Sequence, residues 1–190
     1  LWDAAEGAAV RGVQRIADAL ARGVERDRWS AAEADAALAR LEVVGTLEHL
    51  GDCELIVEAA PEQLAIKHDI FRAASAAAPQ AVLASNTSSI PISAIAPAAA
   101  DPTLVVGMHF FNPAPAMRLV EVIAGLDSGD AALALATATG EAMGKRVIAA
   151  ADVPGFLVNR CSRPFGLEAL RLLQERVADV ETIDAVVRRG

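Results

Sequence analysis

Short apolar runs alternate with helix-like stretches along most of the chain, and this alternation limits the fold more than any other feature of the sequence. Runs suited to strands are expected at residues 1–3, 41–46, 54–57, 81–84, 103–108, 119–123 and 145–149. Continuous apolar runs of this length are typical of strands covered on both faces, as in parallel sheets. Strands that alternate with helices therefore predict an α/β fold whose sheet contains parallel segments.

Helical periodicity separates these runs and continues beyond them. Helices are expected over residues 4–24, 30–40, 61–78, 130–143, 156–174 and 180–189. Ser30 and Glu33 have the spacing of a capping box, and Asp179 is a suitable N-cap. Because only helices are expected after the last strand, we divide the chain into an α/β domain over residues 1–153 and the start of an all-α domain over residues 154–190.

The charge and the cysteines exclude several classes of partner. The formal net charge is −8 at pH 7, which argues against a nucleic acid because a phosphate backbone needs a basic surface. Cys53 and Cys161 lack the spacing of a zinc site or a disulfide framework, so we expect no metal and a reducing, cytoplasmic location. No apolar run reaches the roughly 18 to 20 residues that cross a bilayer, so no membrane partner is expected.

Polar side chains gather at the ends of the expected strands, where open α/β sheets bind their ligands. Asp3 follows the first apolar run and suits either the ribose hydroxyls of a dinucleotide such as NAD or the cap of a helix. Glu62 and Lys67 lie near the start of a helix, where Glu62 either contacts a ligand or complements the helix dipole in a solvated first turn. These local patterns leave both alternatives open.

The remaining candidates follow the middle strands. Five small polar residues, Ser85-Asn86-Thr87-Ser88-Ser89, either form a turn with their own backbone or present a hydroxyl to a ligand. His109 suits a general base near neutral pH, and Glu121, twelve positions later, suits its carboxylate partner. The alternative for His109 is a hydrogen-bonded histidine of the core. Asn159 opens the first C-terminal helix, either as an amide that binds the helix end or as a substrate contact.

Three motifs, taken in order, resemble the 3-hydroxyacyl-CoA dehydrogenase family. They are Ser-Asn-Thr-Ser-Ser from position 85, Gly-x-His-Phe-Phe-Asn-Pro-x-Pro-x-Met-x-Leu-Val-Glu-Val-Ile from position 107, and Asp-x-Pro-Gly-Phe-x-Val-Asn-Arg from position 152. The resemblance covers the chain from Leu1 to Gly190. It implies a Rossmann-type NAD-binding domain followed by the start of a helical domain.

The resemblance also implies a reaction and the residues that perform it. His109 matches the catalytic base, Glu121 its carboxylate partner, Ser88 the serine that contacts the substrate hydroxyl and the cofactor, and Asn159 the active-site asparagine. The implied reaction is hydride transfer between C3 of an L-3-hydroxyacyl-CoA and NAD. His109 would take the proton of the 3-hydroxyl group, and Glu121 would stabilise the imidazolium that forms.

Contacts to NAD are implied for further residues. Asp3 matches the acid that binds the ribose, and Glu62, Lys67 and Asn112 match positions that touch the nicotinamide half. The family's first strand and its Gly-x-Gly-x-x-Gly loop, whose N–H groups cradle the pyrophosphate, are expected to precede Leu1. The helical domain, which closes over the acyl chain and through which a homodimer is expected, would continue after Gly190.

The exact substrate and two other functions stay open. Residues 163–171 resemble bacterial members attributed to phenylacetate catabolism, whose 3-hydroxyadipyl-CoA needs a cationic partner such as Arg160, Arg163 or Arg171. The other substrates are 3-hydroxybutyryl-CoA and the longer chains of fatty-acid β-oxidation. The alternative functions are a related NAD-dependent dehydrogenase of a free hydroxy acid or sugar acid, and a non-catalytic binding protein on the same fold.

Because the pyrophosphate-binding loop is not among these 190 residues, we expect them alone to bind NAD weakly and to turn over slowly or not at all. Titration of the isolated 190-residue chain with NAD, followed by calorimetry, measures this. A micromolar dissociation constant would contradict the expectation.

Overall fold

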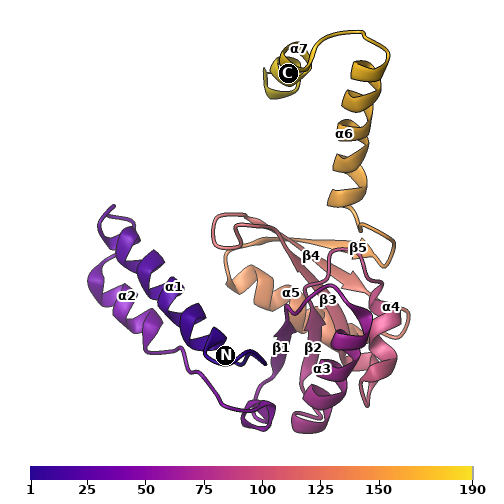
Figure 1. Cartoon of the computed structure of the whole chain (residues 1–190). Coiled ribbons are helices and arrows are strands. Elements are labelled where there is room, and N and C mark those ends of the chain that lie inside the picture. Colours follow the sequence, from indigo (N-terminus) through magenta and orange to yellow (C-terminus); the bar gives the residue numbers. More distant parts are fainter. Residues whose placement is uncertain (190) are drawn as a thin grey trace. The chain divides into compact units, whose positions relative to one another are not determined.

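The computed structural model describes residues 1–189, and it separates into two compact units, Leu1–Cys53 and Glu54–Gly190. In the first unit, α1 (Ala8–Val24) and α2 (Ala31–Leu38) pack together, and a 3₁₀ turn, η1 (Leu47–Leu50), follows (Figure 1). Trp29 lies against Gly23, where a Cβ atom would stand 2.0 Å from the indole. The packing of the Trp29 indole against α1 therefore requires a glycine at that position.

The N-terminal unit corrects three predictions and confirms one. No strand forms at residues 1–3 or 41–46, because the only backbone hydrogen bonds between these segments join Leu1 to Glu42 and to Val44. The first helix starts at Ala8 rather than at residue 4, since Gly7 has a left-handed φ of 70° that a right-handed helix cannot include. The capping box of α2 is confirmed, with both reciprocal hydrogen bonds present.

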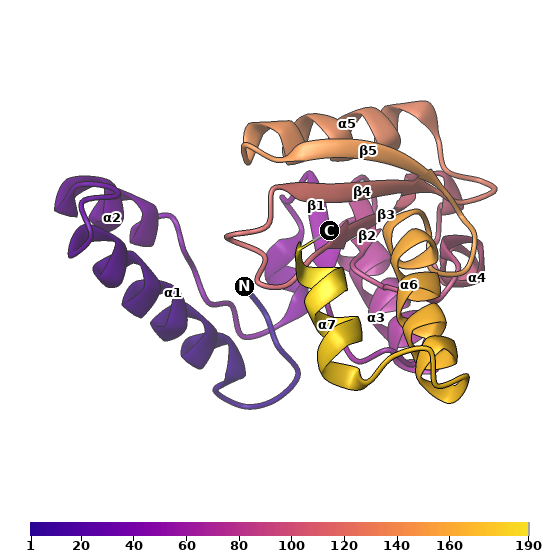
Figure 2. The same ribbon diagram turned by 90° about the horizontal axis from the view of Figure 1, so that it is seen from above.

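The second unit is built on a five-stranded sheet in which the strands lie side by side in chain order (Figures 1 and 2). The strands are β1 (Leu55–Glu58), β2 (Val82–Ser85), β3 (Val105–Phe110), β4 (Leu119–Ala124) and β5 (Arg146–Ala151). β1, β2 and β3 are mutually parallel, β4 is antiparallel to β3, and β5 is parallel to β4. The predicted α/β sheet with parallel segments is confirmed.

Helices cover the two faces of this sheet. One face packs against α3 (Leu64–Ala77) and the single-turn α4 (Ile92–Ile95), and the other against α5 (Asp130–Ala142). Two short 3₁₀ turns, η2 (Ala96–Ala98) and η3 (Pro102–Leu104), lead from α4 into β3. Because side chains alternate along a strand, each central strand contributes apolar groups to both cores.

Two helices follow the sheet, and their bounds differ little from the expected ones. They are α6 (Val158–Gln174) and α7 (Val180–Arg189), and the carboxylate of Asp179 accepts the N–H of Thr182 as predicted for a cap. The domain boundary predicted after residue 153 stays a prediction. The division into two compact units, between Cys53 and Glu54, is a different boundary in the chain.

Two boundary errors and one omitted helix bear on function. α3 starts at Leu64 rather than at residue 61, so Glu62 lies before the helix and not in its first turn. β3 ends at Phe110 rather than at residue 108, so His109 lies within the strand. The third error is the omission of α4, which is a single turn behind Pro91 and too short to show helical periodicity.

Gly107 in β3 is a position where the packing of α4 against the sheet can be tested. A Cβ atom there would lie 2.8 Å from Cδ1 of Ile92 and 2.9 Å from Cβ of Ile123. We expect Gly107→Ala to lower the free energy of unfolding by about 1–3 kcal/mol, measured by urea denaturation, because the core has to move to admit the methyl group.

Gly166 in α6 supplies the matched control, since nothing lies within 4 Å of a Cβ placed there. Gly166→Ala is expected to be neutral or to stabilise the protein by about 0.5–1 kcal/mol, as alanine does in an exposed helix. An equal urea midpoint for Gly107→Ala and the unmodified protein would contradict the packing argument.

Candidate active site

His109 and Glu121 form a buried pair across the two antiparallel strands. They are direct partners in the register of β3 and β4, so their side chains lie on the same face of the sheet. His109 Nδ1 lies 2.5 Å from Glu121 Oε2, and the residues are 5% and 0% exposed. Because a carboxylate can only accept, Nδ1 carries the proton of the neutral ring and Nε2 remains the basic nitrogen.

The second oxygen of Glu121 holds the start of α6. Glu121 Oε1 accepts the backbone N–H groups of Leu157 and Val158, both at 2.9 Å. Each oxygen therefore has its own partners, and the carboxylate cannot rotate without losing hydrogen bonds. Asn159 is the next residue after Val158 and is half-buried. Asn159 therefore directly follows the residue through which Glu121 binds the start of α6.

Two phenylalanine rings flank the imidazole of His109. The ring of Phe111 lies 4.5 Å from it, centre to centre, at an interplanar angle of 55°, and the ring of Phe156 lies 5.7 Å away at 58°. Phe156 is 2% exposed and follows Gly155, and both residues have a positive φ. This turn leads the chain into α6 directly beside the histidine.

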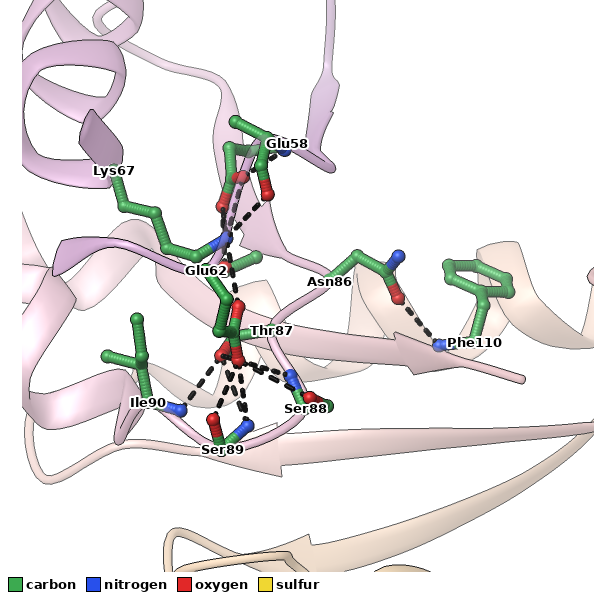
Figure 3. Close-up of polar contacts among 11 residues, drawn as sticks. Glu58, Glu62, Lys67, Asn86, Thr87, Ser88, Ser89, Ile90 and Phe110 are labelled. Atoms are coloured by element: carbon green, nitrogen blue, oxygen red, sulfur yellow. Dashed lines mark hydrogen bonds and ion pairs between the residues drawn. The ribbon is translucent and has the colours of Figure 1, made fainter. Parts of the chain in front are cut away.

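The predicted polar turn is present after β2, and Glu62 holds it (Figure 3). We call Asn86–Ser89 the hydroxyl turn. Glu62 Oε1 accepts Thr87 Oγ1 at 2.6 Å, Ser89 Oγ at 2.9 Å, and the backbone N–H groups of Ser88 and Ser89 at 3.0 Å. The hydroxyl of Ser88 lies 3.4 Å from the same oxygen. Ser88 therefore has the most weakly held hydroxyl of the turn, which leaves it available to a ligand.

One of the two alternatives that the sequence left open for this run is realised, and a contact of the run with a ligand stays a prediction. Thr87 Oγ1 accepts the backbone N–H of Ile90 at 2.9 Å, so the turn does bond to its own backbone. The Ser88 hydroxyl is nevertheless only loosely bound. The solvated first turn expected as one alternative for Glu62 is absent, because Glu62 precedes α3 and its carboxylate binds the hydroxyl turn.

The surroundings of Glu62 favour its ionised form. Partial burial opposes ionisation, but the hydrogen bonds from Thr87, Ser89 and Ser88 and the positive charge of Lys67 outweigh it and lower the pKa of Glu62 to about 2. A carboxylate in this position is charged at any pH at which the protein is expected to function.

Lys67 lies inside the protein, in an ion pair that the sequence analysis did not predict. It is 0% exposed, and its Nζ lies 2.8 Å and 2.9 Å from the two carboxylate oxygens of Glu58 at the end of β1. One oxygen of a second carboxylate, Glu62 Oε2, is 3.5 Å away. The missed signal was a glutamate at the end of an apolar strand, nine residues before a lysine in the following helix.

Contacts between the strands join these two clusters. The side-chain oxygen of Asn86 accepts the backbone N–H of Phe110, the residue after His109, at 2.8 Å (Figure 3). Ser85 in β2 pairs with Gly107 in β3. The hydroxyl turn and His109 therefore lie at the carboxyl edge of the sheet, where β1, β2 and β3 end. His109, Glu121, Ser88 and the start of α6 are gathered at this one edge.

Two predicted residues are not drawn into these contacts. Asn112 is exposed in the connection between β3 and β4, which Lys145 steadies by donating from Nζ to the carbonyl oxygens of Ala114 and Met117. Asp3 belongs to the N-terminal unit, where its carboxylate accepts the N–H of Ala5 at 2.8 Å. Contacts of Asp3 and Asn112 with NAD stay predictions.

Residues 1–189 contain neither a candidate metal site nor a candidate membrane span. Within this part of the chain, no cluster of three histidine, cysteine, aspartate or glutamate side chains is suited to a metal ion. No helix described by the structure combines the length and the apolar character needed to cross a bilayer.

Known protein families match almost the whole chain. A family model described as 3-hydroxyacyl-CoA dehydrogenase, NAD binding domain, matches residues 1–153. A second, described as 3-hydroxyacyl-CoA dehydrogenase, C-terminal domain, matches residues 155–190.

Individual relatives agree with these models. A probable 3-hydroxybutyryl-CoA dehydrogenase of Deinococcus radiodurans is 42% identical over 154 residues, which are 80% of this chain and 55% of that protein. A 3-hydroxyadipyl-CoA dehydrogenase of Escherichia coli is 39% identical over 191 residues, which cover 100% of this chain and 40% of that protein. The crystal structure of a 3-hydroxybutyryl-CoA dehydrogenase from Escherichia coli has a TM-score of 0.96 at 39% identity, again covering 100% and 40%. The chain thus spans about half the length of these curated relatives.

The lowered pKa of Glu62 predicts how stability depends on pH. The folded state has a pKa of about 2 where the ordinary value is 4.5, so the folded protein binds fewer protons than the unfolded chain in that interval. The stabilisation by Glu62 is therefore fully present above about pH 5 and is lost as the pH falls toward 2. We expect the difference in free energy of unfolding between the unmodified protein and Glu62→Gln to shrink as urea denaturation is repeated from about pH 6 to pH 3. A difference that stays constant over this range would contradict the prediction.

Proposed function

The chain belongs to the 3-hydroxyacyl-CoA dehydrogenase family, and on that premise we propose that the protein oxidises an L-3-hydroxyacyl-CoA to the 3-oxoacyl-CoA with NAD. The family and the Rossmann-type fold that the sequence motifs predicted are confirmed by the matches. One observation carries the functional proposal. The buried His109–Glu121 pair lies at the same edge of the sheet as the loosely held hydroxyl of Ser88.

His109 is proposed to act as the general base. With Nδ1 bound to Glu121, Nε2 is the nitrogen that can take the proton of the 3-hydroxyl group. The imidazolium that forms is stabilised by the negative charge of Glu121, which needs no rearrangement because the carboxylate is already held by Leu157 and Val158.

Ser88 and Asn159 are proposed to hold the substrate oxygen. The Ser88 hydroxyl exchanges a 3.4 Å contact with Glu62 for a closer one with the ligand, at little cost because the first contact is long. The amide of Asn159, in the first turn of α6, is proposed as the second donor. Fixing the reacting oxygen between two donors and a base contributes several kcal/mol through orientation.

The residues at the carboxyl edge fit the nicotinamide half of NAD. The exposed Asn112, the partly exposed Glu62 and the Ser88 hydroxyl offer polar groups where open α/β sheets bind nucleotides. Asp3, which is exposed in the N-terminal unit, would hold the ribose hydroxyls. NAD, when bound, accepts the hydride from C3 of the substrate. Lys67 would act on the cofactor only through its neighbours, because it is buried.

The acyl group of the substrate is proposed at the level of its class. The relatives are named for 3-hydroxybutyryl-CoA and for 3-hydroxyadipyl-CoA, so both are substrates to be tested. Arg160, Arg163 and Arg171 are exposed on α6, and Arg171 pairs with Glu168 at 3.3 Å. Arg160 and Arg163 are therefore the better candidates for a distal carboxylate. A role in phenylacetate catabolism or in β-oxidation follows from whichever acyl group is preferred.

The assembly and the location belong to the same proposal. Large apolar side chains are exposed on α6 and α7, among them Phe165, Leu170 and Val186 at 75%, 63% and 66%. Such exposure is unusual for helices that face solvent and favours a surface covered by further protein, which we take to be a homodimer. Two cysteines that form no disulfide with each other fit the proposed cytoplasmic location.

Replacement of His109 tests the function. In a protein that carries this chain together with the expected glycine loop and helical domain, we expect reduction of NAD by a 3-hydroxyacyl-CoA, followed by NADH absorbance. His109→Ala in that protein should lower kcat roughly 100- to 10,000-fold because the general base is lost. His49→Ala is the matched control, since His49 is exposed and belongs to the N-terminal unit. The substrates are 3-hydroxybutyryl-CoA, longer homologues and 3-hydroxyadipyl-CoA.

The outcomes separate the alternative functions. Equal rates with free 3-hydroxybutyrate and with its CoA thioester would favour the dehydrogenase of a free hydroxy acid. Ligand binding without turnover, unaffected by His109→Ala, would favour a binding protein. Full activity in His109→Ala would overturn the assignment of the base.

A further inference from the structure

A second buried ion pair lies at the carboxyl edge, and the mechanism described above does not use it. Lys67 is 0% exposed and Glu58 is 6% exposed, so both charges have been removed from water. The Lys67 ammonium lies 2.8 Å and 2.9 Å from the two oxygens of Glu58 (Figure 3). Each oxygen of Glu58 also has a neutral partner, the N–H of Ala60 at 2.5 Å and the hydroxyl of Ser85 at 2.6 Å.

Stability alone does not account for this arrangement. Desolvation of two charges costs about as much as their attraction returns, and apolar side chains of the same size often serve the fold as well or better. What the ion pair adds is a defined geometry. It joins the end of β1 at Glu58, the end of β2 at Ser85 and the first turn of α3 at Lys67. These three segments surround the hydroxyl turn.

Glu62 connects the ion pair to the hydroxyl turn. Its Oε2 atom lies 3.5 Å from the Lys67 ammonium, while its Oε1 atom collects the four donors of Thr87, Ser88 and Ser89 described above. One carboxylate thus faces the lysine with one oxygen and the turn with the other. Lys67 stands between Glu58 and Glu62, and Glu58 binds it at the shorter distance. Because Glu58 holds the Lys67 ammonium, the lysine does not pull the Glu62 carboxylate away from the turn.

The contacts of Glu62 Oε1 with the turn differ in length. The Ser88 backbone N–H is held at 3.0 Å, whereas the Ser88 hydroxyl lies at 3.4 Å. The hydroxyls on either side, of Thr87 and Ser89, are held at 2.6 Å and 2.9 Å. The anchor therefore fixes the backbone of Ser88 and its neighbours while leaving the Ser88 hydroxyl available.

We propose that Glu58 and Lys67 are positioning residues that act through Glu62 to place the hydroxyl of Ser88 at the carboxyl edge of the sheet. The family resemblance attributes contacts with NAD to Glu62 and Lys67 and assigns nothing to Glu58. The geometry shows Glu62 bound to the hydroxyl turn, and Glu58 and Lys67 bound to each other beside it. The proposal deepens the proposed function and rests on it for the role of Ser88.

Amide hydrogen exchange tests the anchor without any turnover. In Glu58→Gln the side chain keeps its shape but loses its charge, so Lys67 is drawn toward Glu62 and the carboxylate leaves the turn. We expect the Ser88 and Ser89 amides to exchange roughly 10-fold faster, because their acceptor is weakened. The amides of β3 should keep their rates. Asp69→Asn, on the exposed side of the same helix, is the matched control and should change neither group.

Two results of the exchange experiment would overturn the proposal. One is unchanged exchange at Ser88 and Ser89 in Glu58→Gln. The other is an equal acceleration throughout the sheet, which would make the ion pair a general stabilising element. If Glu58→Gln does not fold, Glu58→Asp gives the test, since it keeps the buried charge but shortens the side chain and so weakens its contact with Lys67.

A double-mutant cycle tests whether the anchor acts on Ser88. We expect Glu62→Gln to lower kcat roughly 10-fold when Ser88 is present, because a small displacement of a reacting group is costly. In the Ser88→Ala background the same change should cost at most about twofold, since the group that it positions is gone. A stability role would instead lower activity equally in both backgrounds, and that result would overturn the proposal.

The two experiments keep this inference separate from the proposed function. If the protein fails to reduce NAD with every 3-hydroxyacyl-CoA tested, the proposed function is refuted. The exchange rates alone would then decide whether Glu58 anchors the turn. An active protein whose double-mutant cycle is additive would leave the function standing and refute the positioning role.

Discussion

Glu121 has two carboxylate oxygens, and the protein uses each for a different segment. One oxygen orients the imidazole of His109, and the other accepts the first N–H groups of α6. Because the residue is 0% exposed, water cannot replace either set of partners, and an orphaned buried carboxylate would cost several kcal/mol. The pairing of β3 with β4 and the start of the helical segment must therefore form together. The candidate site depends on this one residue more than on any that a ligand would touch.

The carboxyl edge of the sheet carries two acidic clusters with different tasks. Near the end of β3 and the start of β4, the carboxylate of Glu121 is paired with a group that can gain and lose a proton. At the ends of β1 and β2, Glu58 and Glu62 are paired with a lysine and with neutral donors. The contact from Asn86 to the backbone of Phe110 joins the clusters. The groups that we propose for proton transfer and for placement of the ligand are thus separate, although they lie at one edge.

The strands of the second unit could be predicted from the sequence because they are apolar on both faces and bounded by turn residues. Residues 41–46 have a similar composition but form no strand. A strand exists only if a neighbouring strand pairs with it, and the local sequence does not show which segment that neighbour is. For the same reason, the spacing of His109 and Glu121 predicted a partnership, and only the antiparallel register places them directly opposite each other.

The charged residues near α3 were the least predictable part of the site. Glu62 looked like a first-turn residue, because local patterns describe helix ends and not contacts 25 residues away with Thr87. Glu58 drew no interpretation, since a glutamate at the end of a strand is usually solvated, and its burial follows only from the fold. The roles of Asp3 and Asn112 rest on resemblance alone. The tertiary contacts between charged residues at the strand ends could therefore not be predicted from the sequence.

The shared carboxylate of Glu121 also makes two distant properties reciprocal. Displacing the first turn of α6 removes the donors from one oxygen of Glu121 and so disturbs the alignment of the imidazole bound to the other. Thermodynamic linkage requires the converse as well. A ligand that locks the imidazole in place must also secure the beginning of the helical segment, so the order of the first turn of α6 and the alignment of the proposed base are coupled.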